Sequence, residues 1–245
     1  MRTVLAGAFC AILLVSALPV AAQTVDVALI LANDVSRSID NEEFTLQRQG
    51  YARAISSERV LKAIAAGKHG AIAVTFLEWA GPEEQKFVID WTVIRDGETA
   101  APFAKTMLEA DRSFVGRTSI SAALDYAMDA FAKTQIKADR RVIDVSGDGT
   151  NNSGRPILEA RQAALAQGVI INGLAIINEH PLPGFSAHTQ PPEGLPEYYR
   201  RNVVGGPGSF LLVVQDFSTF GDALIDKLVN EIAANGQGTR LTLAK

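Results

Sequence analysis

Residues 25–38 of the chain read VDVALILANDVSRS. The first eight of them are apolar apart from Asp26, and they include several β-branched side chains. A near-continuous apolar run of this length is typical of a central strand that is buried on both faces of a parallel sheet. Acidic and hydroxyl side chains begin at Asp34, so we expect polar chemistry where this strand ends.

The rest of the chain alternates between strand-like and helix-like segments. Further strands are predicted at 71–79, 85–94, 141–146, 169–177 and 210–214. Helices are predicted at 41–56, 57–66, 99–110, 118–134, 155–167 and 217–234, with a shorter one at 197–203. The turn at Gly81-Pro82 is too short for a crossover, so the strand after it is predicted to be antiparallel to the one before. The fold class that follows is α/β: a doubly wound, mostly parallel six-stranded sheet with one antiparallel edge strand and helices on both faces.

The amino-terminal 22 residues do not fit this fold. Arg2 precedes a short apolar stretch, and Val20-Ala21-Ala22 supplies small residues where a signal peptidase cleaves. We therefore expect a secretory signal peptide at 1–22, with cleavage after Ala22, and a periplasmic or secreted mature protein without a membrane span. Residues 23–245 are then expected to form a single domain, with a Pro- and Gly-rich insertion at about 179–209.

Composition narrows the classes of function. The chain has 23 Lys and Arg against 27 Asp and Glu, a net charge of −4, and no basic block, so nucleic acid is not an expected partner. The single cysteine, Cys10, leaves with the predicted signal peptide, which excludes disulfides and thiolate metal sites in the mature protein. The three histidines show no pair with zinc-ligand spacing.

Three short motifs, far apart in sequence, supply hard oxygen ligands. Asp34, Ser36 and Ser38 follow the first strand, Thr118 follows Gly116 at the start of a predicted helix, and Asp148 follows the strand at 141–146. Ligands of doubly wound sheets bind at the carboxyl ends of the strands, so these side chains are expected at one edge. Carboxylate and hydroxyl oxygens are ligands for magnesium, manganese or calcium.

Taken one at a time, each motif also has an ordinary structural explanation. Ser36 and Ser38 could cap a helix, Thr118 could be a helix N-cap, and Asp148-Gly149 could be only a turn. Asp144 lies inside a predicted strand, where a buried carboxylate needs a partner; Arg141, Arg37 or a loop amide are the candidates.

In order and spacing, the three motifs resemble those of von Willebrand factor A (VWA) domains over nearly all of the predicted mature chain. The resemblance is closest to a group of bacterial secreted proteins with this domain and no assigned function. It implies a metal-ion-dependent adhesion site, in which Asp34, Ser36, Ser38, Thr118 and Asp148 hold a divalent cation. Magnesium is favoured because few carboxylates are present, with manganese or calcium as alternatives.

The same resemblance implies a binding module and not an enzyme. Its partner would be a protein or peptide whose exposed carboxylate completes the coordination of the ion. Candidate partner contacts are Arg37 in the metal loop and Tyr198, Tyr199 and Arg200 in the insertion, since aromatic and arginine side chains are common at binding hot spots. Two alternatives stay open, a metal-dependent hydrolase and a periplasmic solute-binding protein.

Overall fold

A computed structural model describes residues 24–177, 184–215, 220–233 and 240–243, so the predicted signal peptide lies outside the described residues. Seven strands form one sheet: β1 (Thr24–Asp34), β2 (Ile72–Trp79), β3 (Gln85–Ile94), β4 (Lys137–Gly147), β5 (Ile170–Ile176), β6 (Phe210–Val214) and β7 (Arg240–Leu243). The described helices are α1 (Asn41–Ile55), α2 (Glu58–Ala65), α3 (Gly97–Glu109), α4 (Ile120–Lys133), α5 (Ile157–Ala166), α6 (Ser186–Thr189), α7 (Leu195–Asn202) and α8 (Phe220–Ala233).

The strand order is β3-β2-β1-β4-β5-β6-β7, and only β3 runs antiparallel to its neighbour. The predicted fold class, with its antiparallel edge strand, is confirmed. All six predicted strands form, and the short β7 extends the sheet beyond β6. The order of strands reverses between β1 and β4, which makes their carboxyl ends the topological switch point where such sheets bind ligands.

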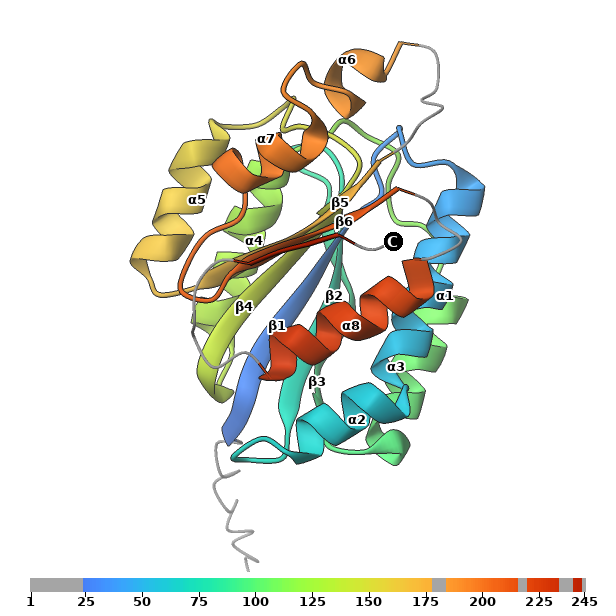
Figure 1. Cartoon of the computed structure of the whole chain (residues 1–245), viewed down its shortest axis with the longest axis vertical. Coiled ribbons are helices and arrows are strands. Elements are labelled where there is room, and N and C mark those ends of the chain that lie inside the picture. The colour runs from blue at the N-terminus through green and yellow to red at the C-terminus, as the bar shows by residue number, and fades with distance from the viewer. Residues whose placement is uncertain (1–23, 178–183, 216–219, 234–239, 244–245) are drawn as a thin grey trace, which may run out of the picture.

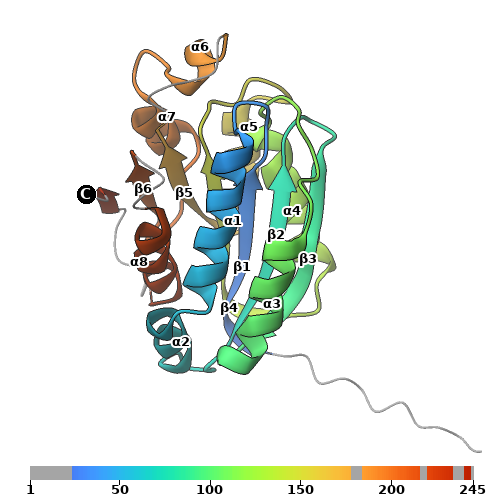
Figure 2. The same ribbon diagram turned by 90° about the vertical axis from the view of Figure 1, so that its right-hand side faces the viewer.

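Side chains of β1 explain why helices cover both faces of the sheet. Val27, Leu29 and Leu31 face a core shared with α1, α2, α3 and α8. Ala28, Ile30 and Ala32 alternate with them and face a second core shared with α4, α5 and α7. The two layers of helices are visible on opposite sides of the sheet in Figure 1, and Figure 2 shows α1 and α3 lying side by side along one of them.

Helix caps remove one ordinary explanation for the polar motifs. Asp40, and neither Ser36 nor Ser38, caps α1, in a capping box with Glu43. Ser119, and not Thr118, caps α4. The hydroxyl side chains of Ser36, Ser38 and Thr118 are therefore not the N-caps of these two helices.

The insertion between β5 and β6 contains α6 and α7 in its described part, residues 184–209. Figure 1 shows α6 at the top of the molecule, beyond the carboxyl ends of the strands. The carbonyl of His188 in α6 accepts a hydrogen bond from the Thr150 amide at 3.1 Å, just after Asp148. The insertion thus reaches the edge of the sheet where the predicted ligands lie.

Candidate metal centre

Parallel pairing of β1 with β4 brings the two aspartates together. Asn33 lies opposite Ser146 in the ladder, so Asp34 ends β1 beside the point where β4 leads into Asp148. The Val35 amide donates to the Trp79 carbonyl at 2.9 Å, which fixes where the chain leaves the sheet.

All five predicted ligands meet in one buried cluster, and none is more than 3% exposed. The Ser38 hydroxyl donates to Asp148 Oδ1 at 2.7 Å, and its Oγ lies 3.3 Å from Ser36 Oγ. The Thr118 hydroxyl donates to Ser36 Oγ at 3.2 Å. Asp34 Oδ1 accepts the Ser36 amide at 2.7 Å. Hydrogen bonds therefore link oxygens from three separate loops in series, from Thr118 through Ser36 and Ser38 to Asp148.

Backbone contacts hold these loops against each other. The Arg37 amide donates to the Gly116 carbonyl at 3.0 Å, which joins the first loop to the second. The Thr118 amide donates to Asn152 Oδ1 at 3.0 Å, and the Asn152 amide returns a bond to the Thr118 carbonyl at 2.9 Å. Asn152 was not singled out from the sequence, although its place four residues after Asp148 is a usable signal.

The carboxylates of Asp34 and Asp148 are buried with too few hydrogen bonds to replace the water that they lose. Asp34 Oδ2 and Asp148 Oδ2 are buried, and neither has a hydrogen-bond partner within the part of the chain that the structure describes. Burial raises the pKa of Asp34 to about 7, against the hydrogen bonds from Ser36. Burial, assisted by the nearby Asp34 carboxylate, raises the pKa of Asp148 to about 7. Two adjacent acids of this kind are stabilised by a cation between them.

Tyr199 closes the cluster from the insertion. A Cβ built on Gly147 would lie 2.7 Å from the Tyr199 hydroxyl and 2.9 Å from Asp34 Oδ2, so only glycine fits between them. Burial, and then the Asp34 carboxylate, raises the pKa of Tyr199 well above its ordinary value. Tyr199 is 0% exposed, and as placed it cannot offer a surface to a partner. Its position differs from the expectation because its ring packs into the core beneath the insertion.

The other candidate partner contacts lie in different settings. Arg37 is exposed between the buried Ser36 and Ser38. Tyr198 is half-buried, and its hydroxyl accepts the Asn151 amide at 3.0 Å. Arg200 is exposed and forms an ion pair with Glu197. Arg37 and Arg200 are therefore the more accessible members of the predicted set.

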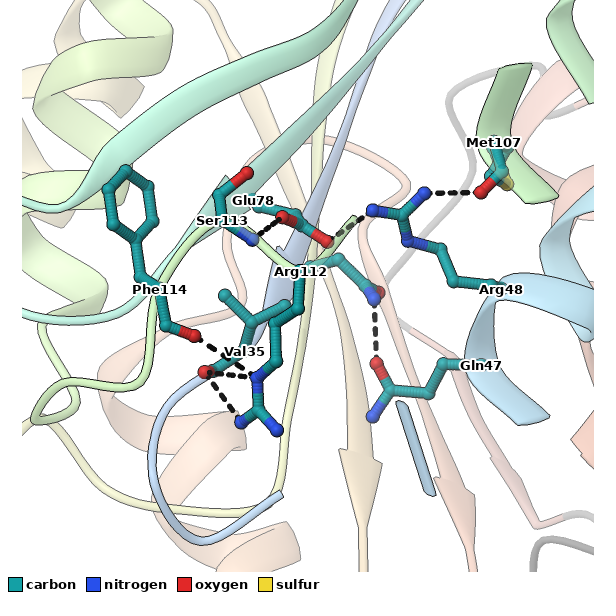
Figure 3. Close-up of polar contacts among 9 residues, drawn as sticks. Val35, Gln47, Arg48, Glu78, Met107, Arg112, Ser113 and Phe114 are labelled. Atoms are coloured by element: carbon teal, nitrogen blue, oxygen red, sulfur yellow. Dashed lines mark hydrogen bonds and ion pairs between the residues drawn. The ribbon is translucent and has the colours of Figure 1, made fainter. Parts of the chain in front are cut away.

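Sequence patterns gave no indication of Arg112. Its half-buried guanidinium donates to backbone carbonyls of the loop that carries Ser36 and Ser38, as Figure 3 shows for Val35. Its positive charge also lowers the pKa of Asp34 and of Asp148, although less than burial raises them.

A second group of potential metal ligands lies near the amino ends of β1 and β4. Ligand atoms of Asp26, His69 and Asp139 lie within 4.8 Å of one another. Each carboxylate already has partners: Asp26 accepts the amides of His69 and Ala71, and Lys68 Nζ lies 3.1 Å from Asp139 Oδ2. We interpret this group as an ion-pair cluster, because Lys68 already supplies a positive charge to Asp139 and His69 Nε2 lies 3.2 Å from the same carboxylate oxygen.

A doubly wound sheet with this cluster at its switch point defines a VWA-like domain, as the sequence motifs predicted. The chain belongs to the family described as "Protein of unknown function (DUF1194)", whose match covers residues 24–236. Among curated proteins, sequence comparison finds no match. Within the described residues, no helix has both the length and the apolar character needed to cross a bilayer.

Three solved structures illustrate the similarity of fold. Proximal thread matrix protein 1 from the mussel byssus has a TM-score of 0.57 at 16% identity, over 86% of this chain and 48% of that one. The von Willebrand factor type A protein from Catenulispora acidiphila has a TM-score of 0.58 at 14% identity, over 84% and 42%. The vWF domain of the pilus tip protein Mfa5 from Porphyromonas gingivalis has a TM-score of 0.53 at 11% identity, over 90% and 99%. This chain thus spans less than half of the first two proteins and nearly all of the third domain.

Proposed function

We propose that the protein is a divalent-metal-dependent binding module of the adhesion type. Asp34, Ser36, Ser38, Thr118 and Asp148 would hold the ion. The observation that carries the proposal is the pair of buried carboxylate oxygens without a hydrogen-bond partner among the described residues, Asp34 Oδ2 and Asp148 Oδ2. They belong to the same cluster as the hydroxyls of Ser36, Ser38 and Thr118. A divalent cation would supply the positive charge that this arrangement lacks and a Lewis-acidic contact for an incoming anion.

The chemistry of the ligand set supports an acidic partner. Neutral hydroxyls leave much of the charge of a divalent ion uncompensated, so a carboxylate from a protein or peptide would gain a strong contact. Arg37 and Arg117, which directly precede Ser38 and Thr118, are both exposed and would add a basic rim. Magnesium is our first choice, with manganese or calcium as alternatives. The mussel protein is known with a zinc-occupied site of this kind, so zinc belongs among the metals to be tested.

The setting we propose is the periplasm or the cell exterior, after removal of a signal peptide at 1–22. The mature chain from residue 23 would then act as one domain, with the insertion of about 179–209 near the binding rim. Neighbours of similar fold with names such as thread matrix protein and pilus tip protein support a binding role without catalysis. A two-lobed solute-binding protein fits less well, because the described residues form one sheet with both faces covered.

Thermal unfolding of metal-stripped protein tests the metal site. At a metal concentration about 100 times the dissociation constant, the folded state should gain roughly 2.7 kcal/mol. We expect this gain to disappear in Asp34→Asn and Asp148→Asn, while the metal-free form of each variant melts at or above the wild-type temperature, because a buried negative charge has been removed. Asp90→Asn, at an exposed position on β3 outside both groups of potential ligands, is the matched control and should respond to metal as the wild type does.

The binding role is tested by capture of proteins from an extracellular or periplasmic extract, with magnesium and with EDTA. Capture should require metal, be lost in Asp148→Asn, and be competed by free glutamate. Capture that persists in EDTA would argue against the ion as the point of attachment.

A further inference from the structure

We propose that Arg112 is a positioning residue that holds the loop 35–39 in its metal-binding shape. The inference rests on the proposed metal site and adds a residue that the adhesion-site motifs do not contain. Arg112 lies in the segment between α3 and α4, six residues before Thr118.

One guanidinium spans both ends of the loop. Arg112 Nη2 donates to the carbonyls of Val35 at 2.8 Å, Ser36 at 2.8 Å and Ile39 at 2.9 Å. Its Nε donates to the Phe114 carbonyl at 3.1 Å. Because these carbonyls converge on a single cation, the loop curls around the guanidinium. The hydroxyls of Ser36 and Ser38 contact each other, and that of Ser38 donates to Asp148, so they are not used in binding the guanidinium.

The backbone next to Arg112 is held by a buried ion pair between Arg48 and Glu78. Glu78, at 0% exposure near the end of β2, accepts the Ser113 amide at 2.8 Å and Arg48 Nη2 at 2.5 Å. Arg48 also donates to the carbonyl of Met107 in α3. Figure 3 shows Glu78 between Arg48 and Ser113, with the Arg112 side chain extending from the same segment to Val35. The segment that carries Arg112 is thereby fixed to both α1 and the sheet.

An aromatic ring completes the support. The Phe44 ring centroid lies 5.0 Å from the Arg48 guanidinium carbon and 5.6 Å from that of Arg112. Cation–π contacts of this kind suit the flat guanidinium. Arginine also donates from two nitrogens, Nη2 to the loop and Nε to Phe114, whereas a lysine has only one nitrogen to offer.

The charge of Arg112 and its hydrogen bonds have opposite consequences for metal binding. As a cation near the site, it repels an incoming divalent ion, so its charge alone would weaken metal binding. As a clamp on the loop, it keeps the serine hydroxyls in place before the ion arrives, which strengthens binding. Substitution therefore distinguishes the two by the sign of the change in affinity.

The test is calorimetric titration of manganese into metal-stripped full-length protein. Arg112→Lys keeps the positive charge but loses the two-nitrogen hydrogen-bonding pattern of the guanidinium. Arg112→Met loses both the charge and the hydrogen bonds. We expect both variants to bind manganese at least about tenfold more weakly than the wild type, the effect seen when outer contacts of metal ligands are removed. Arg161→Lys is the matched control, because Arg161 also donates to a backbone carbonyl, that of Val204, at 2.8 Å, and it touches none of the metal loops. Its affinity should stay within about twofold of the wild type.

Several outcomes overturn the inference. Unchanged affinity in Arg112→Lys, or tighter binding in Arg112→Met, would reduce Arg112 to a charge near the site. A lower melting temperature without a change in affinity, or loss of cooperative unfolding in both variants, would assign it to stability alone. No binding of manganese by the wild type would overturn the proposed metal site together with the clamp, whereas the other outcomes leave the metal site standing.

Discussion

At the scale of single residues, the candidate site is tightly packed and contains buried polar atoms without a hydrogen-bond partner among the described residues. Gly147 is the clearest case, since its missing side chain leaves space that the Tyr199 hydroxyl and Asp34 Oδ2 occupy. The Tyr199 hydroxyl is itself buried and finds no hydrogen-bond partner among the described residues. A buried hydroxyl without a partner lowers the free energy of unfolding, and a phenylalanine at the same position would not carry this penalty.

Gly147→Ala should destabilise the metal-free protein by about 1–3 kcal/mol, because the added methyl must displace one of these two oxygens. Tyr199→Phe should be neutral or stabilising, and combined with Gly147→Ala it should recover part of the loss, since the 2.7 Å contact disappears. Urea unfolding in EDTA measures all three free energies. Wild-type stability in Gly147→Ala would mean that the site is looser than described.

Residue types and spacing were sufficient to predict that five oxygen-bearing side chains meet at this edge of the sheet, because D-x-S-x-S, Gly116-x-Thr118 and Asp148-Gly149 each end or begin an element whose apolar pattern is strong. The function of Arg112 could not be predicted in this way. Its partners are backbone carbonyls of residues 35–39, which any sequence possesses, so the interaction leaves no trace in side-chain pattern.

At the scale of elements, α8 is attached to the sheet by buried charges as well as by its apolar face. Lys227 in α8 forms ion pairs with Asp144 in β4 and with Glu231, and all three side chains are fully buried or nearly so. Sequence analysis required a partner for Asp144 but named Arg141, Arg37 or a loop amide, and this was wrong. Lys227 lies far along the chain, so only the packing of α8 on β4 could identify it.

Lys227 brings one positive charge to two carboxylates, those of Asp144 and Glu231. This imbalance makes one of the two carboxyls hold its proton to a higher pH than usual. Burial, and then the Asp144 carboxylate, raises the pKa of Glu231 to about 7, with Lys227 opposing the shift. Between its unfolded value and about 7, the folded state therefore holds a proton that the unfolded state has released. The resulting stabilisation is complete at low pH and is lost as the pH rises through about 7.

Glu231→Gln should remove this dependence. Relative to the wild type, we expect the variant to gain free energy of unfolding, on the order of 2 kcal/mol, between pH 5 and pH 8. Chemical unfolding at both pH values in EDTA measures the change, and Glu98→Gln, exposed in the first turn of α3, is the control. A wild-type pH profile in Glu231→Gln would show that the carboxyl is ionised throughout.

At the scale of the whole molecule, most of the fold follows from the sequence and the remainder follows from packing. Long apolar strands and amphipathic helices predicted the layered architecture and its antiparallel edge. The first residues of β4, 137–140, and the four-residue β7 were not predicted, because polar or short segments become strands only when a neighbouring strand pairs with them. The switch point between β1 and β4, where the ligands meet, is a property of strand order and not of any one motif.

The central claim is that the three loops that carry Ser36 and Ser38, Thr118 and Asp148 converge around one divalent cation. The most direct measurement is the anomalous scattering of manganese in crystals of the metal-loaded protein. We expect one strong peak per chain, in contact with the oxygens of Ser36 and Ser38 and close to Thr118, Asp34 and Asp148. An empty site there at millimolar manganese, or a single peak at Asp26, His69 and Asp139 instead, would contradict the account.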